Sequence, residues 1–269
     1  MKHRRAIFLA VAWGAYALLA QADTSAKPQT PTQTQTLVVQ ADRWCPFNCQ
    51  PGSAAPGYVV ELLQHVFERD GVKVAYQIVP WDRAVRNAVA GKATAVIGAT
   101  RAEASMRGFL IGREPIGISK DCLYVAHNNP LVYREAADLN ALRKVAVVSG
   151  YSYAGGLGEW VTDPKNKSRI EIGRGDSPVE ASVLNLARGR LDGVIDNESV
   201  LRMVSQTLGV ADKVRMAGCS GNDEVFVAFS ASAPDAAALV LQWDAGLSEL
   251  RRSAKLIPLL SKYGQKDWK

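Results

Sequence analysis

Four cysteines are the residues of this 269-residue chain whose chemistry is easiest to predict. Cys45 and Cys49 stand four positions apart in the segment WCPFNC, a spacing that suits a small disulfide loop or two ligands of a metal ion. No second close pair of cysteines follows, and only His65 and His127 lie beyond the first few residues, so we favour the disulfide. Cys122 and Cys219 then form the second pair by elimination.

The same inventory gives little basis for nucleophilic catalysis. His65 lies within an expected helix, the cysteines are expected to be paired, and no Gly-x-Ser-x-Gly segment is present. An acid or base would have to be a carboxylate such as Asp196 or Glu114. We therefore expect no catalytic residue, no metal and no cofactor.

The first 22 residues have the pattern of an export signal. Lys2, His3, Arg4 and Arg5 precede an apolar run from Ala6 to Ala20. That run is about 15 residues long, against the about 20 that a membrane span needs, and Ala20-Gln21-Ala22 suits signal peptidase. We predict a cleaved signal peptide over 1–22 and a periplasmic protein, in a compartment where disulfides persist. An uncleaved anchor is the alternative, and no cysteine follows the run to accept a lipid.

A polar leader and a weakly basic domain follow. Residues 23–36, DTSAKPQTPTQTQT, contain almost no apolar side chains that a core could bury, which predicts a flexible leader. Cleavage after Ala22 removes three of the 32 Lys and Arg and none of the 26 Asp and Glu, so 29 basic against 26 acidic residues leave a charge of +3. So small an excess, without a basic block, argues against binding of nucleic acid.

From residue 37 onward, β-rich runs alternate with helical periodicities, which predicts an α/β fold with parallel strands. The first unit reads β-α-β-α-β, with strands at 37–41, 72–79 and 93–97 and helices that end at Gly71 and Gly91. The alternation restarts at 145–148. Ser177-Pro178-Val179-Glu180 then predicts a capping box at a helix start, and a strand follows over 191–195.

A last strand at 224–229 and a helical tail over 235–263 have no partner unit of their own. We expect the tail to return to the first unit, so that the chain crosses twice between two lobes, near Cys122 and near Cys219. The predicted organisation is lobe 1 over 37–123 and 221–269, and lobe 2 over 124–220. A Cys122–Cys219 bond would then tie the two crossings together.

Four segments, in this order and spacing, resemble the extracellular solute-binding proteins of family 3, the type II periplasmic binding proteins of ABC transporters. The resemblance covers nearly the whole mature chain and implies a two-lobed fold with two crossings and a ligand held between the lobes. The segments are Trp44-Cys45-Pro46-Phe47, Gly57 to Leu62, Gly91 to Gly98 with Arg107 and Glu114-Pro115, and Gly189 to Asp196.

The resemblance implies roles for several residues in the first lobe. Trp44 corresponds to an aromatic residue that packs on the ligand, and Trp81 to a second apolar wall; core packing is the alternative for both. Arg107 corresponds, with a gap of one residue, to an arginine that grips a ligand carboxylate, or else is a surface arginine. Arg101 departs from the family pattern, and it either favours a more anionic ligand or is solvated.

In the second lobe we expect three further ligand contacts, at Ser152, Asp196 and Tyr151. Ser152 falls at an expected helix start, where it would complete an anion site or act as an N-cap. Asp196 corresponds to a carboxylate that pairs with a ligand ammonium group; in the alternative, Asp196-Asn197 caps the helix that begins near Glu198. Tyr151 and Tyr153 leave room for an aromatic or cyclic ligand.

The function implied is capture of a small polar solute, expected to carry a carboxylate, by a monomeric receptor that delivers it to a membrane ABC permease. Two alternatives remain on the same fold. One is an accessory or sensing protein associated with a dehydrogenase or a kinase, and the other is a dehydratase-type enzyme.

Overall fold

A nine-stranded mixed β-sheet organises residues 35–269, which the computed structural model describes and which fall within one compact unit, Thr34–Lys269. The predicted signal peptide, 1–22, and all but the last two residues of the predicted leader, 23–36, lie outside the described residues. The strands are β1 (Thr36–Ala41), β2 (Lys73–Ile78), β3 (Ala95–Thr100), β4 (Leu110–Ile111), β5 (Gly117–Ala126), β6 (Val145–Val148), β7 (Ile170–Gly173), β8 (Gly193–Asn197) and β9 (Val214–Phe229).

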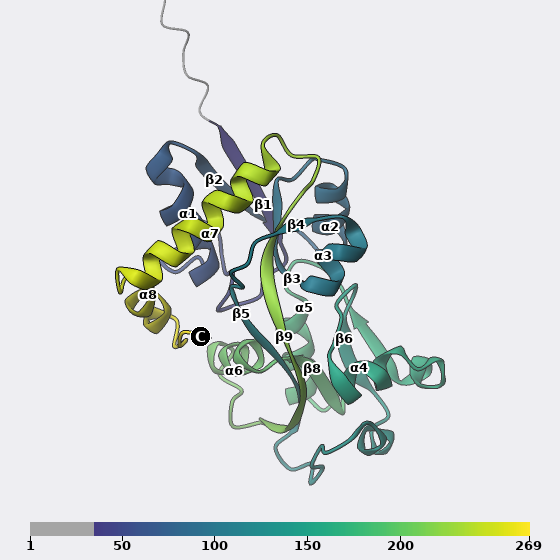
Figure 1. Ribbon diagram of the computed structural model, residues 1–269. Helices are drawn as coiled ribbons and strands as arrows, with labels where there is room; N and C mark the ends of the chain where they lie inside the picture. Colours follow the sequence, from purple (N-terminus) through teal and green to yellow (C-terminus); the bar gives the residue numbers. More distant parts are fainter. Residues whose placement is uncertain (1–34) are drawn as a thin grey trace, which may run out of the picture. The chain divides into compact units, whose positions relative to one another are not determined.

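The sheet has two parallel halves joined by two long antiparallel strands. Its order is β2-β1-β3-β9-β5-β8-β6-β7, and we call β2-β1-β3 the first half and β8-β6-β7 the second half. β9 pairs with β3 through Val225–Phe229, and β5 pairs with β8 through Asp121–Val125. Figure 1 shows β5 and β9 running side by side through both halves. The α/β fold with two crossings is the one that the sequence predicts, and the lobe boundaries predicted at 123/124 and 220/221 fall inside these strands.

Helices cover the sheet by burying one apolar face each. In the first of them all five predicted core positions are buried, namely Val59, Leu62, Leu63, Val66 and Phe67. Burial of such a side chain contributes about 1.5–3 kcal/mol, so this face alone anchors the helix. The helices are α1 (Tyr58–Phe67), α2 (Trp81–Val89), α3 (Arg101–Arg107), α4 (Gly155–Thr162), α5 (Pro178–Ala187), α6 (Glu198–Thr207), α7 (Ala236–Arg252) and α8 (Leu256–Lys262), with short 3₁₀ turns at η1 (Glu68–Asp70), η2 (Ala136–Ala141) and η3 (Pro164–Arg169).

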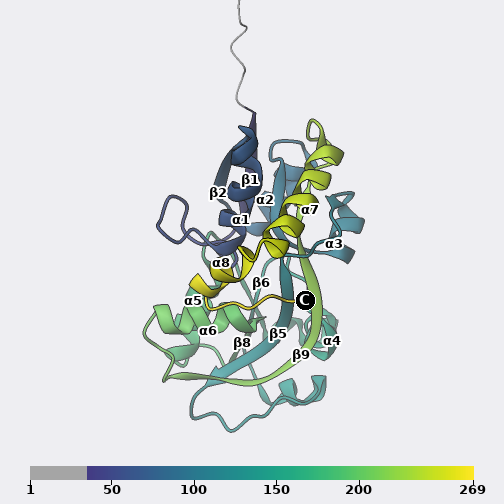
Figure 2. The same ribbon diagram turned by 60° about the vertical axis from the view of Figure 1, so that its left-hand side comes forward.

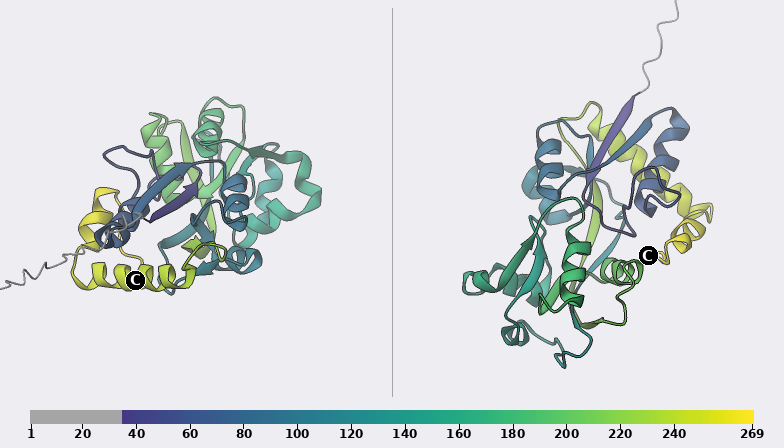
Figure 3. Two further views of the ribbon diagram at one scale, coloured as in Figure 1. Left: turned by 90° about the horizontal axis from the view of Figure 1, so that it is seen from above. Right: turned by 180° about the vertical axis from the view of Figure 1, so that it is seen from behind.

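The C-terminal helices return to the first half of the sheet. α7 packs on α1, with the rings of Phe67 and Trp243 stacked at a centroid distance of 6.5 Å and an Arg69–Glu249 ion pair of 2.8 Å at the surface. Figure 2 shows α7 and α8 beside α1, and Figure 3 shows from behind that the green elements of the second half lie below the strands of the first. Within residues 35–269, none of the helices is long and apolar enough to span a bilayer.

Both predicted disulfides are present, joining Cys45 to Cys49 and Cys122 to Cys219. Cys122 and Cys219 stand opposite each other on β5 and β9, at the point where the two crossing strands pair. The bond therefore connects the two strands that join the halves, as the sequence predicts.

The predicted capping box at α5 is wrong. Ser177 is the N-cap residue and Pro178 opens the helix, but the Ser177 side chain accepts no hydrogen bond from the first turn. The Glu180 side chain, which a capping box would direct back to Ser177, lies instead 3.7 Å from the guanidinium of Arg43. A tertiary ion pair replaces the local cap.

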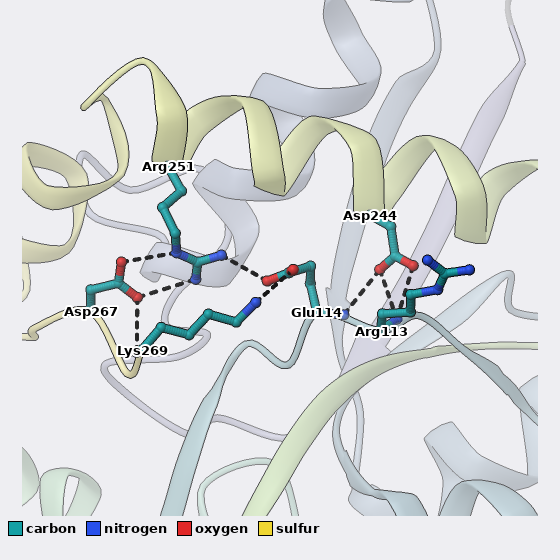
Figure 4. Close-up of polar contacts among 6 residues, drawn as sticks. All are labelled: Arg113, Glu114, Asp244, Arg251, Asp267 and Lys269. Carbon is teal, nitrogen blue, oxygen red and sulfur yellow. Dashed lines mark hydrogen bonds and ion pairs between the residues drawn. The ribbon is translucent and has the colours of Figure 1, made fainter.

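A network of charged side chains fixes the C-terminal residues to the first half, as Figure 4 shows. The guanidinium of Arg251 in α7 contacts Glu114 at 2.7 Å and Asp267 at 2.9 Å. Lys269 adds a 2.7 Å contact to Glu114. The network encloses the segment just before β5, so the end of the chain braces the start of a crossing strand.

Candidate functional site

A small cavity lies where the two halves of the sheet face each other. Its volume is about 40 Å³, which leaves room for only a few water molecules. Ligand pockets commonly measure about 300–1,000 Å³, so a solute larger than a few atoms requires the halves to move apart. The lining residues come from both halves and from β5 and β9: Asp42, Trp44, Trp81, Ile97, Gly98, Thr100, Glu103, Ser119, Asp121, Tyr151, Ser152, Tyr153, Asp196, Asn197 and Val225.

The charged groups of this cavity are all acidic. Asp42, Glu103, Asp121 and Asp196 contribute carboxylates, and the lining, which consists of described residues, includes no Lys, Arg or His. Buried carboxylates are costly unless they meet hydrogen-bond donors or a positive charge. The cavity is therefore electrostatically matched to a cation.

Asp196 carries the least satisfied of these carboxylates. It is the penultimate residue of β8 and is 1% exposed. Its Oδ1 accepts hydrogen bonds from Trp44 Nε1 at 2.8 Å and from the Asn197 amide at 2.7 Å, whereas its Oδ2 is buried without a partner among the described residues. Burial raises the pKa of Asp196 to about 7, although both hydrogen bonds lower it. The free oxygen needs a donor, which a positively charged solute group would supply.

Asp42 and Asp121 are more completely held. Both oxygens of Asp42 accept from the hydroxyl of Tyr151, and burial raises the Asp42 pKa well above its ordinary value. Asp121 accepts from Ser119 Oγ at 3.1 Å and from the Ala154 amide at 2.7 Å, and burial raises its pKa to about 6. A positive charge that enters the cavity would lower both pKa values and favour the ionised carboxylates.

Aromatic rings form the apolar walls. Trp44 stacks on Phe47 with ring centroids 4.1 Å apart, which fixes the plane of its indole. Tyr151 contacts both indoles edge-on, with centroid distances of 6.5 Å to Trp44 and 6.0 Å to Trp81. Tyr153 lies 6.3 Å from Tyr151. Aromatic faces attract cations, so these walls have the same preference as the carboxylates.

Hydrogen bonds between the halves hold this arrangement closed. Trp81 Nε1 donates to the Gly150 carbonyl at 3.1 Å, and Ser149 Oγ donates to Asp82 at 2.6 Å. Ser152 Oγ donates to Glu103 at 2.7 Å. These contacts exist only while the segment after β6 lies against α2 and α3.

Five of the seven residues predicted to contact the ligand line the cavity, and two do not. Trp44, Trp81, Tyr151, Ser152 and Asp196 are brought together. Ser152 lies upstream of α4, which begins at Gly155 after the N-cap residue Ala154, so it is neither the predicted helix start nor a cap. Of the two residues in the alternative cap, Asp196-Asn197, it is Asn197 that caps α6, by accepting from the Ser199 and Val200 amides.

The two predicted arginines lie elsewhere. Arg101 is exposed, pairs with Glu224 at 3.2 Å and stacks over Phe226. Arg107 is exposed on the last turn of α3, one helical turn beyond Glu103, which faces the cavity from the first turn. Four residues of helix amount to about 6 Å of travel, which places Arg107 beyond the lining. In this arrangement neither arginine lies where it could bind a ligand carboxylate in the cavity.

Sequence reasoning missed three of the acidic residues. Asp42 directly follows a predicted strand, and Thr100-x-x-Glu103 has the spacing of a capping box, which the structure contains. Both patterns indicate that the side chains of Asp42 and Glu103 lie near the end of a strand. Asp121 lies within β5 and had no such signal, because nothing in the sequence tells which face of that strand meets the cavity. Glu114, the other carboxylate considered for catalysis, lies in the C-terminal network and outside the cavity.

Solved structures of binding proteins share this fold at low sequence identity. A mutant of ArgBP from T. maritima matches at 19% identity with a TM-score of 0.68, covering 85% of this chain and 94% of that one. A chain from work on glutathione import via GshT and the cystine ABC importer TcyBC of Streptococcus mutans matches at 17% with a TM-score of 0.71, covering 87% and 97%. A histidine kinase sensor domain similar to periplasmic binding proteins matches at 17% with a TM-score of 0.69, covering 86% and 96%.

The sequence itself identifies the family, although no curated protein matches the chain. One family model covers residues 37–266, which includes both halves of the sheet, both crossing strands and every residue of the cavity. This family and the similar structures are binding proteins and not enzymes. The chain belongs to the bacterial extracellular solute-binding proteins, family 3.

Proposed function

We propose that this protein is a periplasmic receptor that closes around a small organic cation and delivers it to a membrane ABC permease. The observation that carries the proposal is the buried, unpartnered Oδ2 of Asp196 in a cavity whose charged groups are all carboxylates. A primary amine, a guanidinium or a basic amino acid would supply the missing donor and the compensating charge.

The proposal keeps the polar solute and the ammonium partner of Asp196 that were predicted from the sequence, and it leaves out the predicted carboxylate. The carboxylate predicted on that solute has no guanidinium partner in the lining. The Ala154 and Leu157 amides at the start of α4 are also occupied, by Asp121 and by Ser220 Oγ. Among the similar structures is an ancestral arginine-binding protein bound to arginine, a solute whose side chain is cationic. That likeness supports the class of solute and not its identity.

Titration calorimetry with a panel of amines, guanidines and basic amino acids tests the proposal. At least one cation should bind, and Asp196→Asn should weaken it by about tenfold or more, because a hydrogen bond to a charged group contributes about 1.5–3 kcal/mol. Asp212→Asn, at an exposed position outside the cavity, is the matched control. The proposal would be overturned if no compound of the panel binds, or if wild type and Asp196→Asn bind the cation with equal affinity.

A sensing role is the second candidate, favoured by the similarity to a histidine kinase sensor domain. A strain that lacks the protein distinguishes the two. Loss of uptake of the bound cation supports delivery, whereas intact uptake with a lost transcriptional response supports sensing.

A further inference from the structure

A second pocket adjoins the acidic cavity and has the opposite electrostatic character. It measures about 340 Å³ and shares Asp42 and Trp81 with the cavity. Three arginines line it, Arg83 and Arg86 from α2 and Arg174 from the loop between β7 and α5. We propose that this arginine pocket binds an anionic group, a phosphate or a carboxylate, and thereby stabilises the closed arrangement of the two halves.

The three guanidinium groups are available for an anion. All three residues are exposed, and none forms an ion pair with another residue in the 35–269 range. The Arg174 side chain makes only a long contact of 3.5 Å to the Ile172 carbonyl. Arg83 and Arg86 are three positions apart, so their side chains leave the same face of α2. A guanidinium offers a planar fork of donors that matches the oxygens of phosphate and carboxylate.

The acidic side chains at this pocket do not cancel its positive charge. Asp82 lines the pocket and accepts a 2.6 Å hydrogen bond from Ser149 Oγ. Asp42 is 2% exposed, and both of its oxygens accept from Tyr151. The formal charge of the lining is therefore positive even with both carboxylates ionised, with three arginines against two aspartates.

The position of the arginines links anion binding to closure. Arg83 and Arg86 belong to the helix after β2, whereas Arg174 follows β7 in the second half. The hydrogen bonds from Trp81 to Gly150 and from Ser149 to Asp82 cross between the halves at the same place. An anion held by arginines of both halves binds the closed arrangement more tightly than an open one, so it shifts the equilibrium toward closure.

The anionic group has two possible sources, which share the same chemistry. It is either a free anion that binds together with the solute, or the anionic end of a solute whose cationic end occupies the adjacent cavity. Only the second source rests on the proposed function, because a free anion can bind whatever the cavity holds.

Titration with sodium phosphate at constant ionic strength, without any amine, tests the pocket itself. Wild type should bind phosphate, and the double variant Arg83→Gln/Arg174→Gln should bind it at least about tenfold more weakly. Arg188→Gln/Arg190→Gln removes the same charge from exposed positions outside the pocket and should bind like wild type. Circular dichroism and thermal melting confirm that both double variants fold.

A second series distinguishes the two sources. ω-Amino acids and diamines of equal chain length are titrated into wild type and both double variants. A diamine that binds more tightly when phosphate is present indicates a free anion. If an ω-amino acid binds Arg83→Gln/Arg174→Gln more weakly than wild type, while the diamine of equal length does not, the anionic group is the solute's own carboxylate.

The proposal is overturned if neither phosphate nor any ω-amino acid distinguishes Arg83→Gln/Arg174→Gln from the control variant. If no amine binds but phosphate binding is intact, only the proposed function is refuted.

Discussion

The indole Nε1 of Trp44 donates a 2.8 Å hydrogen bond to the carboxylate of Asp196, although 152 positions separate the two residues in sequence. Trp44 follows the first strand, and Asp196 lies in β8, the strand of the second half that pairs with β5. The bond therefore crosses the cavity and orients a buried carboxylate. Oδ1 of Asp196 is engaged in this way, and Oδ2 is buried without a hydrogen-bond partner among the described residues.

Replacement of Trp44 by Phe tests this orientation. Phe can keep the contact with Phe47 but removes the Nε1 donor, so the carboxylate of Asp196 loses a stabilising partner and its pKa rises further. Affinity for the cation, measured by calorimetry at neutral pH, should fall and should recover partly at higher pH. Trp160→Phe also removes an indole hydrogen bond, to Asn140 outside the cavity, and should leave the affinity unchanged. Equal losses in both variants would contradict the assigned role.

The raised pKa of Asp196 predicts a pH dependence of stability in the solute-free protein. Because the folded-state pKa is about 7 and the ordinary value is 3.8, the folded state binds more protons between these values. The stabilisation is complete below about pH 4 and is lost as the pH rises through about 7. Thermal melts of wild type and Asp196→Asn should therefore converge at low pH, with the variant the more stable above about pH 7. A difference that is independent of pH would contradict the assignment.

Gly150 lies where the two halves of the sheet meet, because its carbonyl accepts the hydrogen bond from Trp81. It has a φ of +79°, and a Cβ there would lie 2.2 Å from Asp82 Oδ1 and 3.2 Å from the Trp81 ring. Gly150→Ala should therefore hold the halves apart and weaken solute binding by about tenfold or more, since closure contacts contribute to affinity. Small-angle scattering with saturating cation should show a smaller compaction than in wild type. Gly189→Ala has a similar φ of +69° with no atom within 4 Å, so it should lose only local stability and close normally.

The C-terminal network predicts a stability effect confined to one of two adjacent arginines. The side chain of Arg251 is 22% exposed and contacts Glu114 and Asp267, whereas Arg252 is exposed and forms no ion pair within residues 35–269. Arg251→Gln should lower the free energy of unfolding by about 1–2 kcal/mol, and Arg252→Gln by less than about 0.5 kcal/mol. Urea denaturation measures both. Equal effects would show that the network contributes nothing specific.

The sequence predicts the fold well because the fold depends on patterns that repeat along the chain. The helical spacing of Val59, Leu62 and Leu63 and the buried strand before Asp196 are local signals, and the structure contains both elements. The cysteine pairing followed from counting, since four cysteines with one close pair leave a single economical solution.

The charge of the site was harder to predict because it depends on side-chain direction and not on element type. Arg107 and Glu103 both belong to α3, yet only the first turn of that short helix reaches the cavity. The same limitation applies to Ser177, where a local capping signal gave way to the contact between Glu180 and Arg43. A one-turn difference along a helix places Glu103 in the cavity and leaves Arg107 outside it, so the carboxylate predicted on the solute has no guanidinium partner there.

A crystal structure with the tightest-binding cation from the calorimetric panel tests the central claim most directly. We predict that the positively charged nitrogen of the solute lies within hydrogen-bond distance of Asp196 Oδ2, between the rings of Trp44 and Trp81. A solute that presents a carboxylate or an uncharged group to Asp196, or that binds away from Asp196, would contradict the account.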